Sequence, residues 1–323
     1  MIYLPRDLTG FHALNVASTC NKILNVQGEV DIDARHLRFS DPFGIAMLGA
    51  CFHEIKHCNQ DIRVHNLNNN LSGYLQRMDL FNDIELVNCT QSNGSRQNRG
   101  TALVELTMLS LHSEVGNVAH RLAVALVGGF EDIDPNEQPD EMTGYTAYDR
   151  LVEPIQYALN ELLENSLTHA RRGNKNACVW VASQYYPKTG LIRLGVVDNG
   201  CGFLESLRDH KSLEQKRHLD AILLALRPRI SCNRDVGLLS NSVNQGVGLT
   251  TSCRIAEHAE GTMILVSGNA MHSTSGRSGQ SNEAYWQGVG IAIECKRTKL
   301  AEVRVRELLP PLVDISPVNL RFD

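Results

Sequence analysis

The chain has 323 residues, of which 42% are hydrophobic and 21% are charged, a composition typical of a globular protein long enough for two packed domains. Its formal net charge of -5 gives no reason to expect nucleic acid as a main partner. No apolar run approaches the roughly 18 residues of a membrane span, and the beginning of the chain lacks the pattern of a signal peptide. We therefore expect a cytoplasmic protein without a membrane partner.

The first 95 residues alternate between strand and helix patterns. We expect a strand around 23–32, a helix over 45–58, a second strand over 62–65 and a helix that begins near Leu71. Such alternation is typical of a small α/β domain in which helices pack on a sheet.

A connecting region follows over 96–147. A loop rich in Asn, Ser and Arg marks the boundary, and a strand over 101–109 and a helix over 114–126 come next. The acidic segment 128–144 contains two prolines and is typical of a solvated linker.

The pattern over 148–300 predicts a second α/β domain, followed by a C-terminal extension over 301–323. The second domain begins with a long amphipathic helix over 148–170. The segment 203–245 is unusually long for a connection, which is typical of a segment that covers a site. The other elements that we expect are strands over 177–184, 191–198, 262–267 and 290–296, and helices over 219–226 and 249–258.

Three short motifs in this second domain carry chemistry. On the long helix, Glu161 and Asn165 are four residues apart, so they share one face. A carboxylate there can accept a proton from an attacking water, and an amide oxygen is a suitable ligand for Mg²⁺. Taken alone, the spacing is more typical of the polar stripe of an amphipathic helix.

The second motif ends an apolar strand with Asp198, followed by Gly200 and Gly202. The carboxylate could accept a hydrogen bond from an exocyclic amine such as that of adenine, and the glycines let the backbone approach a flat ring. Taken singly, the motif also fits a plain hairpin turn.

The third motif, Gly246-Val247-Gly248-Leu249, leads directly into a helix. Backbone N–H groups at such an entry can hold phosphates, although glycine-rich helix entries are common.

In this order, on a helix, a strand end and a helix start, the three motifs resemble the nucleotide-binding boxes of the GHKL ATPase superfamily, whose fold is the histidine kinase-like or Bergerat α/β sandwich. The resemblance covers about 148–297. It implies binding of ATP and Mg²⁺, with 203–245 as a lid over the nucleotide.

The resemblance also implies a role for each matching residue. Glu161 matches the glutamate that polarises water in hydrolysing members, and Asn165 matches the Mg²⁺ ligand. Asp198 matches the residue that reads the adenine amino group, beside Gly200 and Gly202. The phosphates are held by Gly246, Val247, Gly248 and Leu249.

Two other positions in the second domain bear on the site. The closing strand around Ile291 lacks the threonine that many relatives place beside the adenine-reading aspartate. His169, two turns beyond Glu161, could approach phosphate or could simply end the helix.

The first domain resembles a STAS domain through Val30-Asp31-Ile32, the loop Ser40-Asp41-Pro42-Phe43-Gly44 and the following helix. Phosphorylatable members carry serine directly after the loop aspartate, whereas this chain has Pro42 there. We therefore expect a regulatory or docking module rather than a phosphorylation substrate.

Together the motifs predict a signalling protein, a regulatory GHKL ATPase whose nucleotide state switches the docking of an unidentified protein partner. Two alternatives stay open, a serine/threonine protein kinase of the anti-sigma type and a non-catalytic nucleotide-sensing scaffold. The sequence also leaves a homodimer open.

Overall fold

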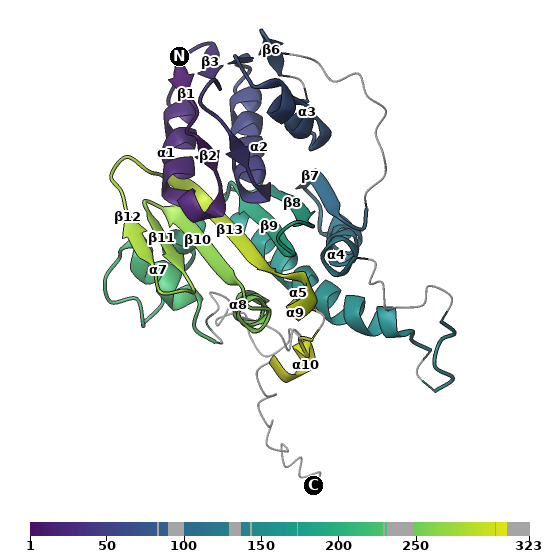
Figure 1. Ribbon diagram of the computed structural model, residues 1–323. Coiled ribbons are helices and arrows are strands. Elements are labelled where there is room, and N and C mark those ends of the chain that lie inside the picture. Colours follow the sequence, from purple (N-terminus) through teal and green to yellow (C-terminus); the bar gives the residue numbers. More distant parts are fainter. Residues whose placement is uncertain are drawn as a thin grey trace.

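A computed structural model of the protein describes residues 1–82, 84–89, 100–128, 137–142, 144–172, 174–228, 230, 248–300 and 302–308. These residues form a mixed α/β fold, as the sequence predicts, with two main sheets and layers of helices (Figure 1). None of the described helices combines the length and the apolar content needed to cross a membrane.

The first unit is a four-stranded parallel sheet whose strands are separated by helices along the chain. Its strand order is β1-β3-β5-β6, which is also the order along the sequence. The short strands β2 (Asp7–Leu8) and β4 (Phe39–Ser40) pair with each other outside it. The elements of the sheet and its helices are β1 (Ile2–Tyr3), α1 (Ala13–Leu24), β3 (Val30–Asp33), α2 (Pro42–His57), β5 (Ile62–His65), α3 (Asn69–Arg77) and β6 (Glu85–Val87).

The strand predicted around 23–32 is wrong in its first half. Ile23 belongs to α1, and the strand β3 begins only at Val30. The buried residues of α1 recur at helical spacing, but most of them are small side chains, which gives a weak apolar signal in the sequence. The helices predicted over 45–58 and near Leu71 are confirmed as α2 and α3.

The second unit is a seven-stranded antiparallel sheet with the order β12-β11-β10-β13-β9-β8-β7. Its edge strand β7 and the helix α4 come from the region 96–147. The strands are β7 (Leu103–Leu109), β8 (Val179–Tyr186), β9 (Leu191–Asp198), β10 (Thr262–Gly268), β11 (Ala270–Ser273), β12 (Ser278–Gln280) and β13 (Trp286–Lys296). The helices of the unit are α4 (His112–Val127), α5 (Ala147–Ala170), α6 (Gly202–Ser206), α7 (His218–Ala225), α8 (Gly248–His258), α9 (Arg297–Leu300) and α10 (Val305–Leu308).

Both faces of the second sheet are buried. On β8, Val179 and Val181 face the core that α4, α5 and α8 share, whereas Trp180 and Ala182 face the core that contains α1 and α2. In Figure 1, α1 and α2 accordingly lie between the two sheets, and α5 and α8 lie on the far side of the second sheet. A sheet covered on both faces needs apolar residues at successive positions, which explains the continuous apolar runs in its central strands.

The N-terminus of α2 packs directly on the second sheet. Asp41 caps the helix, because its Oδ1 accepts a hydrogen bond from the Gly44 N–H at 3.0 Å. A Cβ atom added to Gly195 of β9 would lie 2.5 Å from the Phe43 Cα and 2.6 Å from the Pro42 carbonyl oxygen. Ser40, the hydroxyl residue before the cap, is fully buried in this junction. The two units therefore share a tightly packed contact.

We expect Gly195→Ala to lower the free energy of unfolding by about 1–3 kcal/mol, because the added methyl group overpacks the contact with α2. Gly73→Ala on α3 is the matched control, since nothing lies within 4 Å of its added Cβ. The control should be neutral or slightly stabilising, because alanine favours helix over glycine by about 0.5–1 kcal/mol. Urea unfolding measures both, and a Gly195→Ala variant as stable as the control would contradict the packing of α2 on β9.

Candidate functional site

The helix α5 forms one wall of a pocket in the second unit. Its start is fixed by a capping box, in which the Asp149 N–H donates to Thr146 Oγ1 at 3.1 Å and the Asp149 carboxylate accepts from the Thr146 N–H at 3.0 Å. Because Asn165 and His169 are four residues apart, both reach the same pocket from successive turns.

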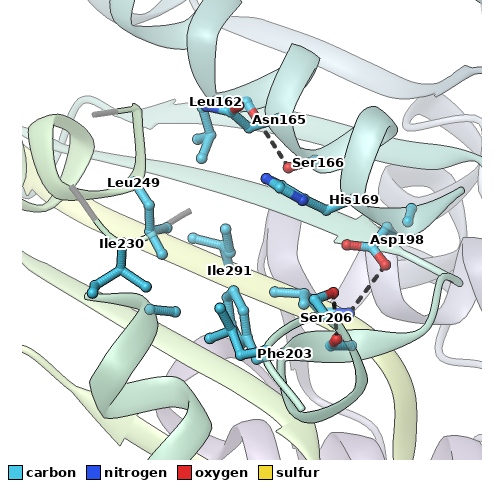
Figure 2. A pocket seen from close by; sticks show the side chains of 15 residues that line it. Leu162, Asn165, Ser166, His169, Asp198, Phe203, Ser206, Ile230, Leu249 and Ile291 are labelled. Atoms are coloured by element: carbon cyan, nitrogen blue, oxygen red, sulfur yellow. Dashed lines mark hydrogen bonds between the residues drawn. The ribbon is translucent and has the colours of Figure 1, made fainter. Parts of the chain in front are cut away.

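The described residues leave an empty volume of about 760 Å³ in this pocket, including the space at its open side. Apolar side chains form most of the wall, and Figure 2 shows them around the space in front of Asp198. The lining residues are Leu162, Asn165, Ser166, His169, Ala170, Asp198, Gly202, Phe203, Ser206, Leu207, Ala225, Ile230, Leu249, Val289 and Ile291.

Asp198 supplies the buried carboxyl group of the pocket. It ends β9 and is only 5% exposed. Its Oδ1 accepts hydrogen bonds from the Gly200 N–H at 2.9 Å and from the Val289 N–H at 3.2 Å. Burial nevertheless raises the pKa of Asp198 to about 7, because these two bonds offset only part of the desolvation. The other carboxylate oxygen faces the interior of the pocket (Figure 2).

The strand β13 completes the surroundings of Asp198. The indole N–H of Trp286 donates to the Asp198 carbonyl at 2.9 Å. A Cβ atom added to Gly288 would lie 2.6 Å from Asp198 Oδ1, so a side chain there would displace the carboxylate. Neither Trp286 nor Gly288 was predicted from the sequence, where this strand stands out only because it lacks a threonine. The W-x-G pattern before Val289 was the available signal.

The two glycines after Asp198 have different surroundings. A Cβ atom on Gly200 would lie 2.6 Å from the Ala170 Cβ, so this glycine lets the loop contact the end of α5. Gly202 has a φ of 73°, which is strained for other residues, and it lines the pocket. The Phe203 N–H then donates to Ser267 Oγ at 3.2 Å, which fixes the beginning of α6.

The start of α8 lies against Asn165. A Cβ atom on Gly248 would be 2.7 Å from Asn165 Nδ2 and 3.1 Å from the Glu161 carbonyl carbon. Leu249, the next residue, lines the pocket. Gly246 and Val247, predicted to hold phosphate with them, lie outside the described residues. The structure thus brings the helix motif and the described part of the third motif into direct contact.

Glu161 lies one turn before Asn165 on α5, and its side chain is partly buried. It is not among the described residues that line the pocket. Its backbone borders Gly248, so it stands near the entrance to α8 rather than near Asp198.

His169 lines the pocket, which the sequence left open. Burial, with a smaller contribution from the charge of Arg172, lowers the pKa of His169 to about 4. The imidazole is therefore neutral near pH 7, so it can donate one hydrogen bond and accept another without adding charge to the pocket. Figure 2 shows its ring between Asn165 and Asp198.

Comparison with known proteins found no matching family model, no matching curated protein and no matching solved structure. Among the described residues, no group of three or more His, Cys, Asp and Glu side chains is arranged to hold a metal ion.

We expect Asp198→Asn to change the pH dependence of stability. A raised folded pKa means that the carboxyl group stabilises the fold below its unfolded pKa of about 3.8 and loses this contribution as the pH rises through about 7. The amide at position 198 loses nothing over that range. The free energy of unfolding of the variant minus that of the unaltered chain should therefore grow between pH 4 and pH 8.

Urea unfolding at several pH values measures this difference. Asp209→Asn is the control, because it removes a carboxylate that is exposed. A difference for Asp198→Asn that does not grow with pH would show that Asp198 is not buried as described.

Proposed function

We propose that this chain is a regulatory ATPase of the GHKL type, with ATP and Mg²⁺ bound by the domain over 148–300. The main support for this proposal is the buried carboxylate of Asp198, which lies at the end of a mainly apolar pocket and directs one oxygen into it. A desolvated acceptor of this kind favours a ligand that brings a hydrogen-bond donor on an apolar body.

Adenine has this chemistry. Its exocyclic amine can donate to the Asp198 oxygen that faces the pocket, while the flat ring packs against Phe203, Val289 and Ile291. The backbone N–H bonds to Oδ1 hold the carboxylate in a fixed orientation before the ligand arrives. Donation to the ionised carboxylate also lowers its pKa, so adenine binding near neutral pH should release a proton.

The phosphates and Mg²⁺ fit at the other end of the pocket, where α8 begins. Asn165 offers an amide oxygen, a hard ligand of the type that Mg²⁺ takes when phosphates and water fill its other positions. The start of α8 contributes N–H groups and the positive end of the helix dipole, and Gly248 leaves no side chain between α8 and Asn165.

Hydrolysis is assigned to Glu161. Its backbone borders Gly248, one turn before Asn165 on α5. In the proposed step its carboxylate accepts the proton of a water that attacks the terminal phosphorus, with ADP as the leaving group. The first 95 residues are the STAS-like module of the proposal, and the nucleotide state changes how this module receives a regulatory protein partner. The packing of α2 on the second sheet offers the physical route between them.

We expect Asn165→Ala to abolish most of the gain in ATP affinity that Mg²⁺ gives, because the variant lacks the amide ligand. Affinity for ADP without metal should stay within about threefold of the unaltered chain. Calorimetric titrations with and without Mg²⁺ measure both, with the exposed Asn176→Ala as the control. An undiminished Mg²⁺ effect in Asn165→Ala would remove this residue from the metal site.

We expect Glu161→Ala to bind ATP as tightly as the unaltered chain and to release phosphate about 10²–10⁴ times more slowly, since it lacks the general base. Glu153→Ala removes an exposed carboxylate from the same helix and should keep its turnover. A phosphate-release assay compares the three proteins. Unchanged turnover in Glu161→Ala would show that Glu161 is not the general base.

A further inference from the structure

The loop that follows Asp198 at the end of β9 is bonded to a residue of the first unit. Asn199 follows Asp198 directly and is 8% exposed. Its Oδ1 accepts a hydrogen bond from the Cys178 N–H at 2.8 Å, and its Nδ2 donates to Oε1 of Glu54 on α2. One buried amide therefore ties the loop both to the segment before β8 and to α2.

Glu54 is well suited to this contact. Its side chain is 35% exposed, and the Nδ1 atom of His53 lies 4.0 Å from the same oxygen that receives the Asn199 bond. The neighbouring His53 and the bond from Asn199 lower the pKa of Glu54. The acceptor is thus ionised at neutral pH, and a hydrogen bond to an ionised acceptor is stronger than one between neutral groups.

We propose that Glu54 is a positioning residue of the nucleotide pocket, which holds Asn199 and through it fixes the place of Asp198. This inference rests on the proposed function. The first unit then sets the affinity for adenine nucleotide without touching the nucleotide. By thermodynamic linkage, a nucleotide bound in the pocket strengthens the contact between Asn199 and Glu54 by the same factor by which that contact strengthens nucleotide binding. The first unit therefore responds directly to nucleotide binding.

The chain contains a spectroscopic reporter for this contact. It has two tryptophans, and both belong to the core that α1 and α2 share with the second sheet. Trp286 donates its indole N–H to the Asp198 carbonyl at 2.9 Å, and the Trp180 ring lies 5.1 Å from the ring of His53, the neighbour of Glu54. Intrinsic tryptophan fluorescence therefore reports on the position of the loop even without nucleotide.

The test compares Glu54→Ala, Glu54→Gln and the control Glu85→Ala, which removes an exposed carboxylate paired with Arg63 elsewhere in the first unit. We expect Glu54→Ala to weaken ADP binding about tenfold, the effect of one lost charge-assisted bond, and to shift the tryptophan emission of the nucleotide-free protein. Glutamine keeps an oxygen that accepts from Asn199, so the ADP affinity of Glu54→Gln should stay within about threefold of that of the unaltered chain. Glu85→Ala should bind ADP as tightly as the unaltered chain.

A double-mutant cycle shows whether Glu54 acts through Asn199. In an Asn199→Ala background, Glu54→Ala should cause no further loss of ADP affinity. An ADP affinity and an emission spectrum of Glu54→Ala equal to those of the unaltered chain would overturn the positioning role. An equal loss in both backgrounds would overturn it too, because Glu54 would then act by another route.

Failure of the proposed function looks different. If the unaltered chain binds no ADP, the nucleotide proposal fails, and the claim that Glu54 sets the affinity fails with it. The emission of nucleotide-free Glu54→Ala then decides separately whether Glu54 holds the loop. Circular dichroism of each variant establishes that the comparison is made between folded proteins.

Discussion

A carboxylate buried at the end of β9 imposes the main constraint on this structure. An acid that is 5% exposed is strongly destabilised as an anion unless hydrogen bonds replace the lost water. Two backbone N–H groups provide part of that replacement to Asp198, and Gly288 leaves the space in which the carboxylate sits. The remaining desolvation, visible in the raised pKa, is what a ligand with a suitable donor can relieve.

The layered fold makes this burial possible. Because helices cover both faces of the second sheet, the end of β9 is shielded from water on each side. The helix α2 follows β9 on the face toward the first unit, with Phe43 packed at Gly195 and Glu54 bonded to Asn199 after the strand end. The first unit is therefore part of the environment of the pocket, and a change in either unit acts on a shared set of contacts.

The sequence predicted the elements with strong periodicity and missed those whose signal depends on packing. The helix over 148–170 and the strand over 191–198 agree with α5 and β9, because their apolar positions repeat over many residues. The helix α1 was missed, since its buried face consists largely of alanine, cysteine and threonine. The burial of α2 between two sheets depends on long-range contacts that no local pattern encodes, although a helix that is apolar on nearly every side is typical of a buried one.

The residues of the candidate site also divide into those with a local sequence motif and those that only packing brings together. Asn165, Asp198 and Gly202 were predicted from local motifs, and all three line one pocket. Trp286, Gly288 and Glu54 come from distant parts of the chain, and only their contacts with the loop reveal them. The catalytic role of Glu161 stays a prediction, as do the phosphate contacts of Gly246 and Val247.

Recognition of adenine by Asp198 can be measured by calorimetric titration of the unaltered chain with ATP and with GTP in the presence of Mg²⁺. One ATP should bind per chain, and GTP should bind at least about tenfold more weakly, because guanine presents an acceptor where adenine presents its amine. Equal affinity for the two nucleotides, or no binding of either, would show that Asp198 does not recognise adenine.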